Sequence, residues 1–123
     1  MAAGDYGVRL GDRWLAVVER KSFDNLVSSL VDGTLAFQLG RLAELPLAAV
    51  VVEGRYPALF AVPRVPDGWL PDVLARLQLR YREIPIVFAD SRKFAEQWTY
   101  CFLAAVLSDA DDTGPEPSSH PPP

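Results

Sequence analysis

An apolar run over residues 14–18 leads directly into three charged residues, Glu19, Arg20 and Lys21. An uninterrupted apolar run rich in valine predicts a β-strand that is buried on both faces. Charged side chains at the end of such a strand need a partner or a ligand, because burying an unpaired charge costs free energy. Side chains alternate along a strand, so Glu19 and Lys21 share one face and Arg20 takes the other.

A carboxylate and an ammonium on one face of a strand end suit a metal-assisted hydrolytic site. The carboxylate binds a divalent cation, and the lysine lies near the attacking water and the developing phosphate charge. A plain ion pair between Glu19 and Lys21 explains the same pattern, so this stretch alone leaves both interpretations open.

The strand that carries Glu19 is predicted to form a hairpin with residues 4–10, and Asp5 lies on the first strand. Asp5 and Glu19 bind one cation only if they share a face of the sheet. A hairpin centred on Asp12 places them directly opposite each other, whereas a two-residue turn at Gly11 and Asp12 places Asp5 opposite Val18. A shared cation site therefore requires an odd-length loop or a β-bulge.

The sequence around this hairpin has a specific pattern. Gly4-Asp5 is followed, after a spacer, by Glu19-Arg20-Lys21, and the next helix carries Ser-Ser-Leu-x-Asp-Gly. A Gln and an Arg-Leu follow, and the next strand ends in a Glu. The residues at these later positions are Ser28, Ser29, Leu30, Asp32, Gly33, Gln38, Arg41, Leu42 and Glu53.

This pattern resembles the XPF-type structure-specific endonuclease domain of the restriction-endonuclease-like superfamily, from residue 4 to about residue 107. Two departures stand out. The last Asp of the family signature falls on Asn25, with an Asp one position earlier at Asp24, and only three residues precede the Gly-Asp, where the family has a first strand and helix.

The resemblance implies an α/β fold: a mixed sheet flanked by helices, without the family's first strand and helix. It also implies a DNA endonuclease, dependent on Mg²⁺ or Mn²⁺, that hydrolyses phosphodiesters in branched or flapped DNA during DNA repair and leaves a 5′-phosphate. Asp5 and Glu19 would hold the metal, Lys21 would activate the water, and Arg20 would support the group. Asp24 is a further candidate metal contact, or a simple first-turn acid.

The resemblance also implies a homodimer or a partner protein. It further implies that Gln38 and Arg41 face the active-site cleft, although a solvent-exposed surface position explains this pair as well. Arg92 and Lys93 fall in the first turn of a helix, where the helix dipole disfavours cations, so we expect them to face DNA phosphates. Arg76 and Arg80 lie one turn apart, and a solvated surface is favoured over a nucleic-acid contact for this pair.

The rest of the chain alternates helices and strands. We expect helices over residues 23–32, 35–42, 69–82 and 92–107, and strands over residues 47–53 and 84–88. Ser22, Thr34 and Ser91 are the expected N-caps, and Gly33 is the expected C-cap of the first helix. Cys101 is expected in the core of the last helix.

Composition limits the remaining possibilities. The formal net charge is −4, but four acidic residues lie between residues 109 and 116, so the body is near neutral. We expect one domain over residues 1–108 and a disordered acidic, Pro/Ser-rich tail over residues 109–123. A single cysteine excludes a disulfide within the chain and suits a cytoplasmic location; no signal peptide or membrane-spanning run is evident.

Two other functions stay open. One is a catalytically degenerate nuclease fold that serves as a scaffold for dimerisation or DNA binding, and the other is a non-nuclease α/β module. The few residues before Gly4 further predict an exposed sheet edge or an open apolar groove beside residues 4–10.

Overall fold

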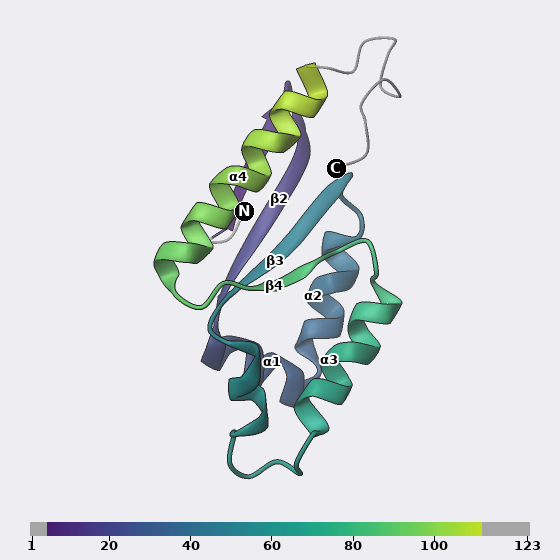
Figure 1. Ribbon diagram of the computed structural model, residues 1–123. Helices are drawn as coiled ribbons and strands as arrows, with labels where there is room; N and C mark the ends of the chain where they lie inside the picture. The colour runs from purple at the N-terminus through teal and green to yellow at the C-terminus, as the bar shows by residue number, and fades with distance from the viewer. Residues whose placement is uncertain (1–4, 112–123) are drawn as a thin grey trace.

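One mixed sheet carries helices on both of its faces in the computed structural model, which describes residues 5–111 (Figure 1). Within that range the sheet has the order β1-β2-β3-β4. Its strands are β1 (Asp5–Leu10), β2 (Arg13–Ser22), β3 (Leu47–Glu53) and β4 (Ile86–Phe88). β1 and β2 are antiparallel, and β3 and β4 continue the sheet parallel to β2. The expected mixed sheet is confirmed.

The β1–β2 hairpin combines a two-residue turn with a β-bulge. Leu10 pairs with Arg13 and Arg9 with Trp14, but Val8 pairs with Ala16, so Leu15 is an extra residue on β2. A bulge of this kind shifts the register by one residue. The expected condition for a shared cation site is therefore met, because the shift brings Asp5 opposite Glu19.

Two short helices follow β2 and cover one face of the sheet. Helix α1 (Phe23–Asp32) begins where the Ser22 hydroxyl accepts a hydrogen bond from the Asn25 amide. It ends at Gly33, whose φ of 83° is accessible to glycine at little cost. Helix α2 (Thr34–Leu42) begins immediately afterwards.

The start of α2 differs from the expectation. Thr34 is the first helical residue rather than the N-cap, and Gly33 holds the cap position. The cap oxygen comes from Asp32, whose Oδ1 accepts hydrogen bonds from both the amide and the hydroxyl of Thr34. One carboxylate therefore stabilises the abrupt turn between the two helices.

The larger core lies between the sheet and helices α1, α2 and α3 (Trp69–Arg80), with the 3-10 helix η1 (Tyr56–Phe60) at its end. Val17, Val50 and Val52 enter it from the strands, and fully buried leucines enter it from the helices. Gln78 links α3 to the sheet, since its side chain donates to the Ile84 carbonyl and accepts from the Ile86 amide.

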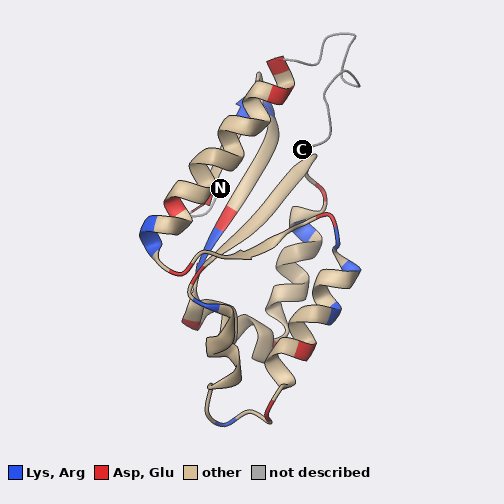
Figure 2. Cartoon of the chain, in the orientation of Figure 1, with Lys and Arg blue, Asp and Glu red and all other residues tan. Residues whose placement is uncertain are grey.

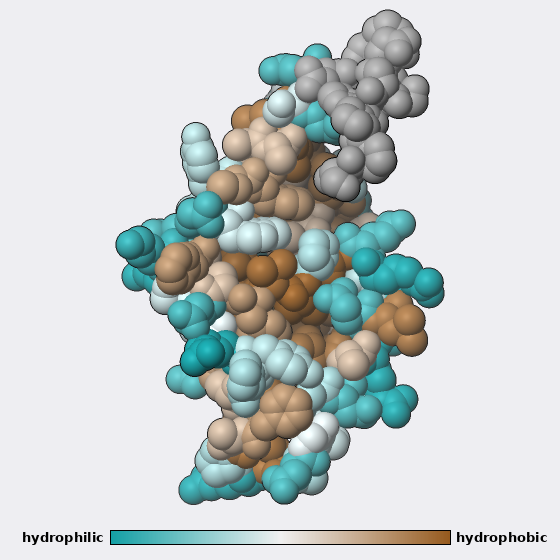
Figure 3. Space-filling model, viewed as in Figure 1, coloured by the Kyte–Doolittle hydropathy of each residue, from teal (hydrophilic) through white to brown (hydrophobic). Residues whose placement is uncertain are grey.

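Helix α4 (Arg92–Asp111) covers the opposite face alone (Figure 1). Val18, Ala49 and Val51 pack against Ala95 and the neighbouring part of this helix. Among the described residues, β4 pairs with β3 alone, so it is an edge strand of the sheet. Its three residues are half-buried. Apolar side chains gather in the middle of the face seen in Figure 3, at the level of this strand.

Several boundaries differ from the sequence expectations. α3 ends at Arg80, and β4 begins at Ile86 instead of residue 84. α4 continues to Asp111, beyond the expected domain boundary at 108, and the tail from residue 112 onward lies outside the described residues. Cys101 is exposed rather than in the core, because α4 packs on the sheet through Ala95, Thr99 and Val106 instead. No helix between residues 5 and 111 is long and apolar enough to cross a membrane.

Candidate active site

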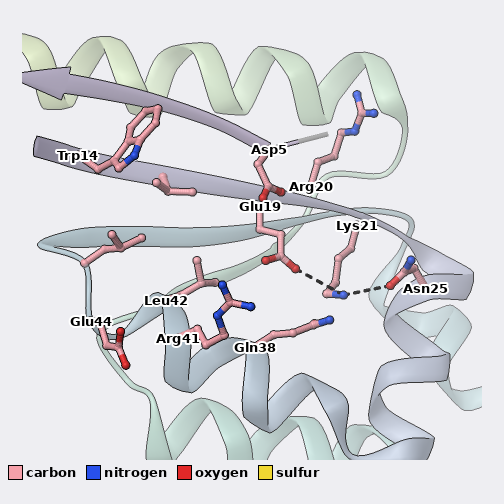
Figure 4. A pocket seen from close by; sticks show the side chains of 12 residues that line it. Asp5, Trp14, Glu19, Arg20, Lys21, Asn25, Gln38, Arg41, Leu42 and Glu44 are labelled. Carbon is pink, nitrogen blue, oxygen red and sulfur yellow. Dashed lines mark hydrogen bonds and ion pairs between the residues drawn. The ribbon is translucent and has the colours of Figure 1, made fainter. Parts of the chain in front are cut away.

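A cleft of about 550 Å³ opens between the β1–β2 hairpin and helices α1 and α2 (Figure 4). Strand residues supply one wall and helix residues the other. The polar side chains that line it include Asp5, Glu19, Lys21, Asn25, Gln38, Arg41 and Glu44. The helical wall depends on Gly33, because this glycine allows the sharp turn by which α2 folds back after α1.

Asp5 and Glu19 face each other across the hairpin at its cleft side. They are direct partners in the β1–β2 ladder, and directly opposed residues share a face of the sheet. Both side chains line the cleft and lie side by side in Figure 4. The expected shared face is confirmed.

Lys21 lies next to Glu19 and is almost completely buried, with 4% of its surface exposed. Its Nζ is 3.5 Å from Oε2 of Glu19 and donates a hydrogen bond of 3.0 Å to Oδ1 of Asn25. A buried ammonium requires such partners, since an unpaired one would be strongly destabilising. The two contacts fix the position of the Lys21 ammonium inside the cleft.

Arg20 points to the other face of β2, as the alternation of side chains predicts. Its Nε lies 2.9 Å from Oε2 of Glu53, and its Nη1 donates to the Tyr6 hydroxyl. The guanidinium also lies over the Tyr6 ring, with its carbon 5.8 Å from the ring centroid. These contacts join the ends of β1, β2 and β3 behind the cleft.

Helix α2 contributes Gln38 and Arg41 to the cleft. Oε1 of Gln38 is buried and has no hydrogen-bond partner among residues 5–111. A buried carbonyl oxygen without a donor is rare in folded proteins and indicates a place for a water or a ligand. Gln38 and Arg41 both lie on the helical wall opposite the strand carboxylates (Figure 4).

Three other candidate residues lie outside this cleft. Asp24 is exposed in the first turn of α1 and lines a separate shallow hollow with Ser28 and Thr34. Arg92 and Lys93 are exposed in the first turn of α4, the helix that packs on the opposite face of the sheet, and Arg92 lies 4.0 Å from Glu96. The structure therefore does not bring these three residues together with Asp5 and Glu19.

Sequence reasoning missed two supporting contacts. Asn25 departs from the family signature, but its position four residues after Lys21 also predicts contact between the two side chains at the strand–helix junction. Glu53, at the end of β3, was assigned no role, yet it pairs with Arg20. Arg20 and Glu53 each lie at the end of an apolar strand, and this shared position is the sequence signal that could have identified the pair.

The carboxylates of the cleft are compatible with a hard divalent cation. Residues 5–111 contain no group of three His, Cys, Asp or Glu side chains that could form a complete metal cage. Mg²⁺ typically binds through one or two carboxylates and keeps waters or substrate phosphate oxygens as its other ligands. Asp5 and Glu19 supply that minimal donor set at an open cleft.

Comparison with known proteins agrees with this geometry. The ERCC4 domain family matches residues 1–102. XPF from Aeropyrum pernix in complex with DNA is similar to this chain with a TM-score of 0.56 and 29% sequence identity, covering 80% of this chain and 46% of that chain. A second structure of XPF from Aeropyrum pernix gives a TM-score of 0.52 at 29% identity, covering 88% of this chain and 49% of that chain.

This chain thus spans about half the length of the structures that it matches. No curated protein sequence matches it. The matched region includes the hairpin, the cleft and about the first half of α4, and the mixed sheet with its flanking helices agrees with the fold of the Aeropyrum pernix protein. This chain belongs to the ERCC4 domain family and has the XPF-type nuclease fold.

Proposed function

We propose that the cleft hydrolyses phosphodiester bonds in branched or flapped DNA, as an endonuclease that depends on Mg²⁺ or Mn²⁺ and serves DNA repair. The observation that carries this proposal is the convergence of Asp5, Glu19 and the buried Lys21 on one cleft. Membership of the ERCC4 domain family supports it, as does the similarity to an XPF protein whose structure contains DNA.

Asp5 and Glu19 would hold the cation. When bound, it supplies positive charge beside the phosphate oxygens. Lys21 donates toward the developing negative charge, and its two partners keep its ammonium aimed into the cleft. The attacking water forms a new P–O bond and loses a proton as the P–O3′ bond breaks and O3′ gains one, which leaves a 5′-phosphate.

The helical wall would position the substrate. Oε1 of Gln38 can accept a hydrogen bond from the attacking water or from a nucleotide group, which would relieve its lack of a partner. Arg41 would bind a phosphate of the strand in the cleft. Arg92 and Lys93, in the first turn of α4, would contact DNA outside the cleft.

Nicking of a labelled flap substrate in Mg²⁺ or Mn²⁺ tests the proposal. Lys21→Ala should lower turnover by about two or more orders of magnitude while DNA affinity stays nearly unchanged, because the lysine acts mainly in the transition state. Glu19→Gln and Asp5→Asn should lower turnover and also raise the Mg²⁺ concentration needed for half-maximal rate.

Arg76→Ala is a suitable control, since Arg76 is exposed, pairs with Asp72 and does not line the cleft. Chelation with EDTA should abolish nicking, and excess Mg²⁺ should restore it. Wild-type rates in both Lys21→Ala and Glu19→Gln would remove the nuclease assignment from these residues.

A degenerate scaffold is the second candidate function. Asn25 at the position of the signature Asp, and the presence of only two strand carboxylates in the cleft, are the observations that favour it. DNA binding without cutting by the wild-type chain supports this scaffold. A chain that neither binds nor cuts DNA supports the non-nuclease α/β module, in which Glu19 and Lys21 only pair.

Self-association through α4 is the partner interaction that we favour. Tyr6 of β1 and the neighbouring side of α4 line an apolar groove of about 500 Å³, with Tyr100, Leu103 and Leu107 in its walls. This groove lies beside β1, where the sequence predicts one. A second copy of the chain is the occupant that the family resemblance implies. Tyr100→Glu should abolish a concentration-dependent rise in mass measured by light scattering, and an unchanged rise would overturn this interface.

A further inference from the structure

A second hollow adjoins the active-site cleft. It has a volume of about 310 Å³ and shares Leu42 and Leu45 with the cleft as wall residues. Its other wall is the end of α3 and the segment that follows, which contribute Arg80, Tyr81 and Arg82. The two hollows therefore meet at the turn between α2 and β3.

Guanidinium groups without carboxylate partners gather at this meeting point. Arg41 lines the cleft, and Arg80 and Arg82 line the second hollow; none of the three forms an ion pair within residues 5–111. By contrast Arg76, one turn earlier on α3, binds Asp72 at 2.8 Å. Figure 2 shows basic positions together at the neighbouring C-terminal ends of α2 and α3.

The helix dipole explains part of this arrangement. Cations are favourable in the last turn of a helix, where Arg41 and Arg80 lie. The dipole does not explain Arg82, which follows the helix, or the convergence of residues from α2 and α3 on adjoining hollows. Arginines that leave their charge unpaired around a concave surface are typical of phosphate recognition.

Tyr81 adds an aromatic surface to the same hollow. Its ring is half-buried, and the guanidinium carbon of Arg80 lies 5.6 Å from the ring centroid. Arginine beside an aromatic ring is a combination that binds the backbone and bases of single strands. Two acidic residues, Glu44 and Glu83, also line the hollows, so their charges oppose binding of a polyanion.

We propose that the DNA strand leaving the active-site cleft crosses the turn between α2 and β3 and is held in the second hollow by Arg80 and Arg82. This inference rests on the proposed function and extends it, because it names the path of the substrate strand outside the reacting phosphate. Arg80 and Arg82 bind two phosphates, and Arg41 links this contact to the cleft.

The test measures binding of a fluorescein-labelled flap duplex and of its single strand by anisotropy at several salt concentrations, with nicking measured in parallel. Arg80→Ala/Arg82→Ala should raise the Kd by about tenfold near 100 mM salt, and should reduce the slope of log K against log salt by about 1.4 to 1.8. At saturating DNA its nicking rate should match the wild type, because neither side chain touches the reacting phosphate.

Two matched variants sharpen the comparison. Arg76→Ala removes one positive charge from the same helix outside both hollows and should leave the Kd within about twofold. Glu44→Gln removes an opposing charge from the path and should lower the Kd by about threefold. An unchanged melting temperature of the Arg80/Arg82 double variant excludes general loss of folding as the cause of its higher Kd.

The outcomes separate the strand path from the proposed function. A double variant with the wild-type Kd and salt slope overturns the path, even if the wild-type chain cuts DNA. A double variant with the reduced slope supports the path, even if the wild-type chain binds DNA without cutting it. A wild-type chain that binds no DNA overturns both proposals.

Discussion

Lys21 donates a 3.0 Å hydrogen bond to the side-chain oxygen of Asn25, in the first turn of α1. The XPF-type signature that this chain resembles has an Asp at that position. An amide oxygen preserves the contact with the ammonium, but it carries no charge and is a weaker partner than a carboxylate. The difference leaves Glu19 as the anion closest to Lys21 in the cleft.

We therefore expect Asn25 to position Lys21. Asn25→Ala should lower kcat for nicking by about tenfold with little change in KM, because Lys21 loses one of its two fixed partners. Asn25→Asp keeps the oxygen acceptor and should stay within about threefold of the wild-type kcat. Asn25 is exposed, so neither change should alter the melting temperature by more than a few degrees.

The contrast between the two substitutions decides the role of Asn25. Equal loss of activity in both variants contradicts a positioning role, because the carboxylate retains the contact geometry that alanine lacks.

Arg20 and Glu53 should contribute to stability rather than to the chemistry of the cleft. Their side chains are 18% and 20% exposed, and the ion pair joins β2 to β3 on the face covered by α4. Removing either partner leaves a partly buried charge unpaired. Glu53→Gln should lower the free energy of unfolding by about 1 to 3 kcal/mol.

A double-mutant cycle with Arg20→Gln isolates the pair, with unfolding measured in urea. The coupling free energy should be favourable, and Tyr6→Phe corrects for the hydrogen bond that Arg20 also donates to Tyr6. A coupling near zero would mean that solvent already screens this pair.

The local chemistry of the chain was sufficient to predict most of its elements. The valine-rich runs predicted β2 and β3, and Ser22 and Gly33 predicted the bounds of α1, because caps and buried strands depend on neighbouring residues. The exposure of Cys101 could not be predicted, since Ala95, Thr99 and Val106 define the buried side of α4 only once the helix lies on the sheet.

The cleft was predictable only in part. The alternation of side chains along a strand correctly predicted that Glu19 and Lys21 share one face of β2 and that Arg20 lies on the other. The alignment of Asp5 with Glu19 depends on the bulge at Leu15, which no local pattern revealed. The second hollow joins α2 to α3, and the sequence could not place Arg80 there, because a helical pattern gives no information about which element lies beside the helix.

Asp32 makes the junction of α1 and α2 sensitive to acid. Hydrogen bonds from the amide and hydroxyl of Thr34 lower the pKa of Asp32 below its usual range. A lowered pKa in the folded state means that the stabilisation is present above the pKa of the unfolded chain and is lost as the pH falls through the folded-state pKa. Asp32→Asn should therefore be less stable than the wild type at pH 7.

Urea midpoints at pH 7 and at about pH 3 measure this effect. The difference between the wild type and Asp32→Asn should shrink at the lower pH, because protonation removes the charge of Asp32 in the wild type as well. A difference that is the same at both pH values would assign the loss to side-chain shape instead of charge.

Alanine substitution should have opposite effects on the free energy of unfolding at Gly7 and at Gly40. A Cβ on Gly7 would lie 2.8 Å from the Trp14 ring and 2.9 Å from the Ala16 carbonyl oxygen, so β1 or the ring must move. Gly7→Ala should cost about 1 to 3 kcal/mol, as other overpacked sites do. Because Trp14 also lines the cleft, the movement should reach the active-site wall.

Gly40 lies inside α2, where a Cβ would meet only the Tyr81 hydroxyl at an ordinary 3.5 Å. Gly40→Ala should increase the free energy of unfolding by about 0.5 to 1 kcal/mol, because alanine loses less conformational entropy than glycine in a helix. Urea unfolding of both variants checks the pair. A stabilising Gly7→Ala would show that the Trp14 ring does not rest against β1, and the hairpin would then not form a fixed wall of the cleft.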